Sequence, residues 1–133
     1  MAPALPDAAN TDLSQLVAAA ADLCRRPLRH GVVLESGNDD LDCSLRLEVR
    51  SAQGERLEHE DLELEIYRSG ATVHLTLAWR AEELQPMLWQ GEHPVWMDPQ
   101  GRRSERPADG LPLEALARRL RALLVPLSLE EDR

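Results

Sequence analysis

The sequence contains no lysine and no phenylalanine, and Ile66 is its only isoleucine. All 15 basic residues are therefore arginines, so an arginine at a given position is no sign that this position requires a bidentate guanidinium. The only cysteines are Cys24 and Cys43, and they form no C-x-x-C pair. We interpret both as small buried hydrophobic residues, and the alternative is a disulfide or a pair of metal ligands.

Motifs for catalysis, metal binding and phosphate binding are absent as well. There is no G-x-S-x-G segment, no glycine-flanked cysteine and no glycine-rich phosphate loop. The segment "EHED" at 58–61 lacks the spacing of metal ligands, and "GNDDLD" at 37–42 does not follow the order of a calcium loop. The histidines do not occur at i, i+4 on a helical pattern; they are His30, His59, His74 and His93.

Because these motifs are absent, we expect that the protein has no catalytic residue, binds no metal and uses no cofactor. One enzymatic alternative stays open, in which His93 and Glu92 form a general acid–base pair near Arg102 or Arg103. It depends on a geometry that the sequence does not define.

Several classes of partner are also disfavoured. The formal net charge of −9 argues against nucleic acid, because binding to phosphates requires clustered cations. No apolar run approaches the roughly 20 residues of a membrane span. The first residues lack the basic and apolar regions of a signal peptide. We therefore expect no membrane partner and a cytoplasmic protein.

At 133 residues the chain has the size of one domain. We predict a flexible N-terminus at 1–10, a single α+β domain at 11–126 and an acidic C-terminal tail at 127–133. Apolar residues recur with helical spacing in "TDLSQLVAAAADLCRRP", with Thr11 as the N-cap and Pro27 as the stop. A second helix is predicted in "LPLEALARRLRALLVP", which Pro126 ends.

Four strands are predicted between these helices. The segments "DCSLRLEVR", "LELEIYR" and "TVHLTLAW" alternate apolar and polar residues, which is typical of strands with one buried face, and "GVVLES" precedes them. The turn "RSGA" joins the last two strands in a hairpin. We therefore expect the order αββββα, an antiparallel four-stranded meander with both helices on one face.

The stretch "WQGEHPVWMDPQGRR" at 89–103 holds two of the three tryptophans. Its "DPQG" fits a type I turn, which predicts a small extra hairpin near 95–104. Trp89 and Trp96 have three interpretations: a plug that closes the open end of the core, a hot spot for protein contact, or a small-molecule pocket. The pocket would use Trp89, His93, Trp96, Arg102 and Arg103.

Charge is distributed unevenly along the chain. Acidic residues predominate from Glu35 to Glu65, whereas arginines predominate from Arg102 to Arg121. We expect a non-catalytic protein-binding module, such as an assembly factor, a chaperone-like adaptor or a regulatory subunit, whose partner is another protein or a second copy in a homodimer. The predicted binding face is the exposed polar side of the sheet: Arg46, Glu48, Arg50, Glu63, Glu65, Tyr67, His74, Thr76 and Arg80. The alternative function is small-ligand binding at 89–103.

Overall fold

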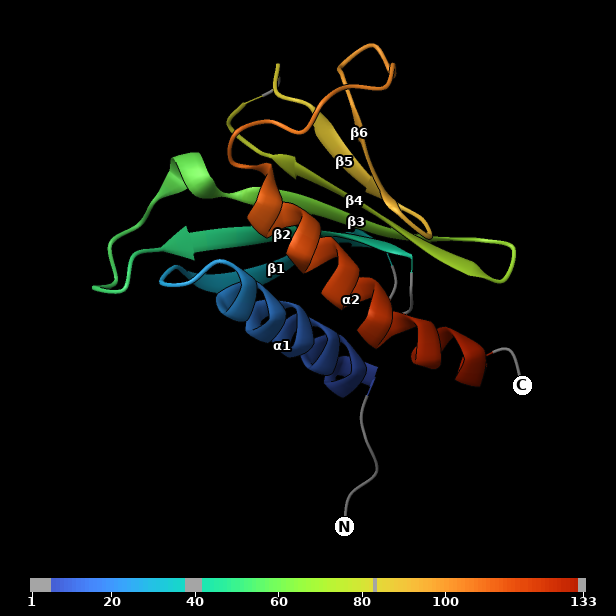
Figure 1. Cartoon of the computed structure of the whole chain (residues 1–133). Helices are drawn as coiled ribbons and strands as arrows, with labels where there is room; N and C mark the ends of the chain where they lie inside the picture. The colour runs from blue at the N-terminus through green and yellow to red at the C-terminus, as the bar shows by residue number, and fades with distance from the viewer. Residues whose placement is uncertain (1–5, 38–41, 83, 132–133) are drawn as a thin grey trace.

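The computed structural model describes residues 6–37, 42–82 and 84–131, with the backbone alone at 6–12 and 126–131. In chain order its elements are α1 (Pro6–Cys24), β1 (Arg29–Gly37), β2 (Cys43–Arg50), the short 3-10 helix η1 (Glu58–Glu60), β3 (Leu62–Ser69), β4 (Thr72–Trp79), β5 (Met87–Gln90), β6 (Pro94–Met97) and α2 (Gly110–Glu131). The strands form one layer, and α1 and α2 lie together against one face of it (Figure 1). The predicted α+β fold with a helix at each end is confirmed.

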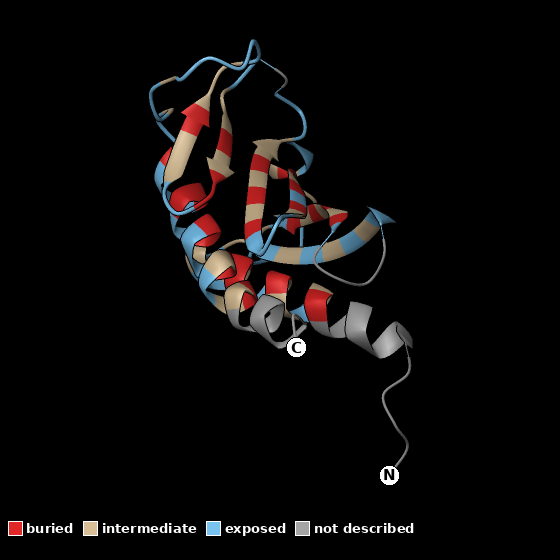
Figure 2. Ribbon diagram, turned by 90° about the vertical axis from the view of Figure 1, so that its right-hand side faces the viewer, coloured by how far each residue is buried: buried red, intermediate tan, exposed pale blue. Residues whose placement is uncertain are grey.

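The sheet is an antiparallel meander in the order β1-β2-β3-β4-β5-β6. The predicted alternation places one apolar residue opposite another: Leu45 pairs with Leu64, and Leu64 pairs with Leu77. These rows are fully buried under the helices. Figure 2 shows the resulting alternation of buried and less buried residues along the central strands. We call the helix-covered side the inner face and the opposite side the outer face.

The sheet has two more strands than the four of the predicted meander. β5 pairs with β4, and β6 pairs with β5. The predicted turn at Asp98 forms, since Gly101 N–H donates to the Asp98 carbonyl at 2.9 Å. The hairpin beyond this turn is reduced to a bridge between Met97 and Arg103, because β6 has β5 as its main partner. Burial of Leu88 and Trp96 on the inner face stabilises this arrangement.

Both helices extend beyond the bounds that the sequence predicts. α1 begins at Pro6 instead of Thr11, and proline suits a first helical position. α2 continues through Pro126 to Glu131, so the prediction that Pro126 ends the helix is wrong. Proline removes only one backbone hydrogen bond, and a helix that is already packed can continue past it with local bending.

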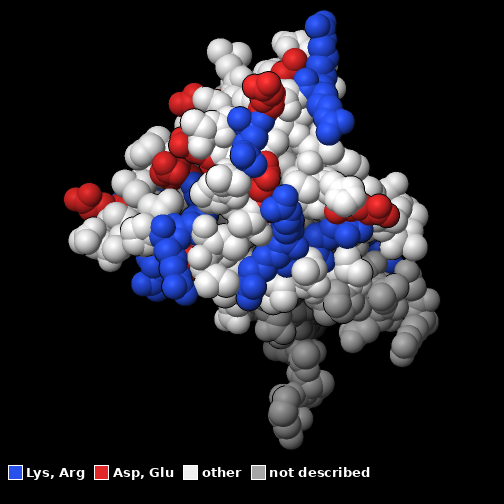
Figure 3. Space-filling view, viewed as in Figure 1, with Lys and Arg blue, Asp and Glu red and all other residues white. Residues whose placement is uncertain are grey.

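Part of the opposed charge of the chain lies on opposite sides of the sheet. Arg118 and Arg119 are exposed on α2, and arginine side chains gather over the middle of the molecule where α2 crosses the sheet (Figure 3). The acidic segment contributes Glu48 and Glu63 to β2 and β3, where they project from the outer face.

Candidate functional site

The outer face carries the residues predicted for partner binding. Arg50, Glu65 and Arg80 are exposed, and the others are half-buried: Arg46, Glu48, Glu63, Tyr67, His74 and Thr76. The face is therefore less exposed than predicted. No helix among the described residues covers it, and its side chains shield one another instead.

Two arginines and three glutamates form an ion-paired cluster on this face. The Arg80 guanidinium lies 2.6 Å from Glu63 Oε1 and 3.4 Å from Glu35 Oε2. The Arg46 guanidinium lies 3.5 Å from the same Glu35 oxygen and 3.1 Å from Glu48 Oε2. Because Arg46 and Glu63 are register partners on β2 and β3, the strands themselves bring the opposite charges together.

Glu35 and Glu63 affect each other's protonation. Burial and a hydrogen bond with Glu35 raise the pKa of Glu63, whereas the hydrogen bond with Glu63 and the nearby Arg80 lower the pKa of Glu35. A cavity of about 350 Å³ lies beside the cluster, between Arg46 and Arg80, but neither carboxyl group lines it.

Three aromatic side chains stack beside this cluster. The His74 ring lies between Tyr67, at a centroid distance of 5.3 Å, and Trp89, at 5.2 Å. Trp89 Nε1 donates to the Tyr67 hydroxyl at 2.8 Å. The Trp89 ring also approaches Gly91 so closely that a Cβ there would lie 2.6 Å from it. We call Tyr67, His74 and Trp89 the aromatic triad.

The structure does not bring Trp89 and Trp96 together. Trp89 pairs with Val95, and Leu88 pairs with Trp96, so adjacent register positions place the two indoles on opposite faces. Trp96 is 5% exposed in the core and stacks on Trp79 at 6.3 Å. Its Nε1 donates to buried Glu114 at 2.7 Å. Trp96 therefore occupies the position of a core plug, and Trp89 does not.

The other residues of the predicted pocket lie outside the named strands. His93, Arg102 and Arg103 are exposed in the turns around β6. Arg102 donates its backbone N–H to the Asp98 side chain, and Arg103 forms a backbone bridge. Residues 89–103 thus build a strand pair and its turns.

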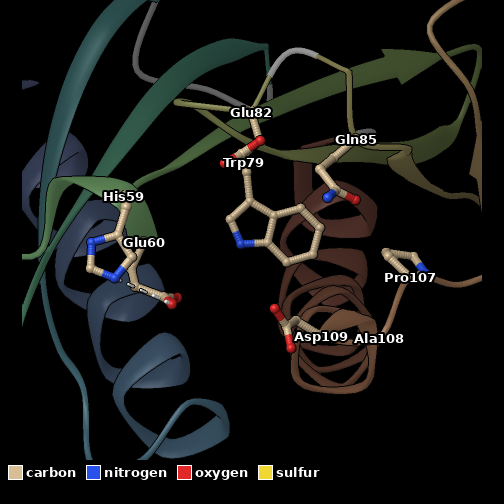
Figure 4. Close-up of a pocket in the computed structure, with 8 residues that line it drawn as sticks. All are labelled: His59, Glu60, Trp79, Glu82, Gln85, Pro107, Ala108 and Asp109. Atoms are coloured by element: carbon tan, nitrogen blue, oxygen red, sulfur yellow. Dashed lines mark ion pairs between the residues drawn. The ribbon is translucent and has the colours of Figure 1, made fainter.

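A cleft opens instead at the end of the inner face, between the last turn of α1 and the first turn of α2. Two adjoining cavities of about 580 and 210 Å³ share Glu60, Trp79, Ala108 and Asp109 as lining residues. Figure 4 shows the Trp79 indole projecting between Glu60 and Asp109, with Gln85 and Pro107 on the far side. The cleft combines one aromatic surface with carboxylates on both walls.

One wall of the cleft is held by a buried polar network. Arg25, which directly follows α1, is 5% exposed and contacts Glu60 Oε2 at 2.7 Å. Its Nη1 lies 3.0 Å from His30 Nε2, which must accept because a guanidinium only donates. His30 Nδ1–H is then left to donate to Asp22 at 2.9 Å. Burial, followed by the nearby Arg25, lowers the pKa of His30 despite Asp22.

Sequence reasoning missed this network and the cleft. Glu60 is far along the chain from Arg25, and no local pattern connects an arginine at a helix end with a distant loop glutamate. Alternation in "TVHLTLAW" predicts that Trp79 points inward, but its stacking on Trp96 depends on β5 and on the pairing of β5 with β6, which the sequence did not predict.

Comparison with protein families gives a match over most of the domain. A family model matches residues 14–123. The chain belongs to this family, DUF8659, which is described as a domain of unknown function. The matched part of this DUF8659 chain includes all six strands, and hence both the outer face and the Trp79 cleft. No curated protein and no solved structure matches the chain.

The described residues contain neither a membrane-spanning helix nor a cluster of metal ligands. Neither α1 nor α2 is long and apolar enough to cross a membrane in the part of the chain that the structure describes. Within the same residues, no three His, Cys, Asp or Glu side chains are grouped as metal ligands. Both cysteines are free, with Cys43 buried and Cys24 half-buried at the cleft.

Proposed function

We propose that the chain is a non-catalytic protein-binding module, an assembly factor, chaperone-like adaptor or regulatory subunit, that binds a partner protein on its outer face. The observation that carries this proposal is the aromatic triad on a sheet face that no described helix covers. Tyrosine, tryptophan and arginine are the residues most enriched at the centres of protein interfaces. The two free cysteines favour a cytoplasmic location, which is part of the proposal.

The triad is already held in one arrangement before a partner binds. The hydrogen bond from Trp89 to Tyr67 and the two stacking contacts fix all three rings relative to one another. These three side chains would therefore lose little conformational entropy when a partner binds to them. His74 Nδ1 is buried without a hydrogen-bond partner in the described residues, so one polar atom is still to be satisfied within the triad.

The neighbouring charge indicates the chemistry of the partner. Glu65 pairs with Thr76, and Thr76 pairs with Trp89, so the three lie in one row across the outer face. Adjacent strands are about 4.8 Å apart, which puts the Glu65 carboxylate within reach of a group that covers the triad. Glu65 is exposed, unlike Glu63 in its ion pair. We expect a partner surface with an arginine or lysine beside apolar side chains.

The experiment compares tagged wild type with Trp89→Ala and Glu65→Arg in affinity capture from the source lysate, with quantitative mass spectrometry. The expected result is one protein that wild type enriches and that both variants lose, with thermal unfolding near that of wild type. Arg119→Glu, an exposed change on α2 that also alters charge, is the matched control and should retain that protein. If both outer-face variants retain every protein that wild type enriches, the outer face is not the binding surface.

A second candidate function is small-ligand binding, now at the Trp79 cleft instead of residues 89–103. The larger cavity, about 580 Å³, falls within the roughly 300–1,000 Å³ of ligand sites. Native mass spectrometry of the protein purified from its source would show an added mass for the wild type that Trp79→Ala loses. If no such mass appears on the wild type, this second function is rejected.

A further inference from the structure

The two edges of the sheet differ in how they are protected. β6 is four residues long and begins with Pro94, which has no N–H to offer. The following segment bonds back to β6, with Ser104 N–H on the Trp96 carbonyl at 2.8 Å. β1 is nine residues long, contains no proline and pairs only with β2 among the described residues. Figure 2 shows β1 with exposed and half-buried residues along its whole length.

Two hydrogen bonds show which backbone groups of β1 point out of the sheet. His30 N–H donates to the Asp22 side chain at 2.7 Å, and its register partner Val49 donates its own N–H to Asp61 at 2.9 Å. His30 and Val49 are therefore a pair without mutual hydrogen bonds. In an antiparallel ladder such pairs alternate with bonded ones. Val32 and Leu34 thus direct their N–H and C=O groups away from β2.

We propose that two copies of the chain associate through β1 and join their sheets into one, as an antiparallel homodimer. A two-fold axis at Val33 places Val32 of each copy opposite Leu34 of the other, so that the free groups of both residues form hydrogen bonds across the axis. This register does not need the His30 N–H that Asp22 already holds. It also ends before the irregularity between Leu34 and Ser36.

The side chains of β1 suit a second copy as the occupant. Val33 is 37% exposed and would meet its own equivalent on the axis. In the same register Gly31 lies opposite Glu35 of the second copy, so Arg29 becomes a diagonal neighbour of that carboxylate, and by symmetry this occurs twice. The Arg29 side chain is 70% exposed, and its contact with Asp22 is 3.7 Å. This inference does not depend on the proposed function, although the dimer would make the two outer faces continuous.

The experiment measures mass by light scattering after size exclusion across a concentration series, on wild type and three variants. Wild type is expected to approach twice the monomer mass as concentration rises. Val32→Pro removes an outward N–H from the edge, together with a side chain that packs against the core, and Val33→Lys places like charges on the axis, so both should stay monomeric. Val95→Lys, on the outer face of the opposite edge strand, is the matched control and should dimerise.

Amide exchange gives an independent measurement. Raising the concentration of wild type should slow exchange at Val32 and Leu34 and leave Val33 unchanged, because its N–H already bonds to β2. If Val32→Pro does not fold, the mass of Val33→Lys and the amide exchange of wild type still test the proposed dimer. A wild type that stays monomeric at every concentration, or a Val33→Lys variant that still dimerises, would overturn the proposal.

Discussion

The inner and outer faces of the sheet each hold one tryptophan from the same short stretch of sequence, and each indole donates one hydrogen bond. Trp96 donates to Glu114 at 2.7 Å in the core, and Trp89 donates to Tyr67 at 2.8 Å on the outer face. The bonds are alike, but the surroundings are not: Trp96 is 5% exposed among leucines and helices, whereas Trp89 is half-buried on a face without a helix. We infer that the first indole mainly stabilises the fold, while the second is available for binding.

The largest expected effect comes from truncating each indole in turn. Trp96→Ala should lower the free energy of unfolding by about 3–5 kcal/mol, because it leaves a cavity in the core. Trp89→Ala should cost only about 1 kcal/mol, since it removes stacking at a half-buried position. Chemical denaturation of both variants measures the difference. Equal losses would contradict the division between the two faces.

A smaller effect tests the hydrogen bond that orients the inner indole. Glu114→Ala leaves the buried Trp96 N–H without an acceptor and should cost about 1–3 kcal/mol. Glu114→Gln keeps a carbonyl oxygen that can accept, so it should retain most of the stability. Denaturation midpoints compare the two variants. If alanine and glutamine have the same effect, the bond to Trp96 is not what Glu114 contributes.

The sequence predicted which residues of the central strands point inward, but it did not predict the faces of β5 and β6. Strict alternation in β2, β3 and β4 predicted which residues point inward, because eight-residue strands contain several periods. β5 and β6 have four residues each, too few for periodicity to assign a face. Their faces follow from pairing with β4, which is a tertiary contact. The roles of Trp89 and Trp96 were therefore left open between core plug, protein-contact hot spot and small-molecule pocket.

The same limit applies to the polar residues. An arginine at a helix end, such as Arg25, complements the helix dipole by a local rule, but the fold buries Arg25 against Glu60 and His30. Alternation predicted which polar residues lie on the outer face, yet it did not predict the half-burial of Arg46 and Glu63, whose ion-pair partners lie on other strands or beyond them.

The third expected effect is smaller: the stability of the protein should depend on pH through His30, on the inner side of the sheet. The pKa of His30 is lower in the folded protein than its ordinary value of about 6.5. Its charged neighbours are Asp22 on α1, Arg25 directly after α1 and Asp61 before β3. The unfolded state therefore binds the proton more readily, and stability should fall as pH drops below about 7, until the folded-state pKa is passed.

Thermal unfolding between neutral and mildly acidic pH measures this loss. His30→Gln should reduce the slope, and His59→Gln should leave it unchanged because His59 is exposed at the cleft rim. A slope that survives in His30→Gln would assign the effect to other groups. The lowered pKa of Asp61, which its hydrogen bond with Arg56 maintains against burial, acts at lower pH.

The smallest expected effect concerns the ion pairs of the outer face. Arg80 and Glu63 lie 2.6 Å apart, but their side chains are 41% and 40% exposed. Water and salt screen such a pair, so Arg80→Ala should cost about 0.5 kcal/mol at moderate ionic strength, and less as salt rises. Denaturation at low and high salt measures this, with Arg50→Ala as the control because Arg50 donates to a loop carbonyl instead. A loss as large as that of Glu114→Ala would mean that the cluster stabilises the fold, and the outer face would then be less free to serve as a binding surface than its exposure indicates.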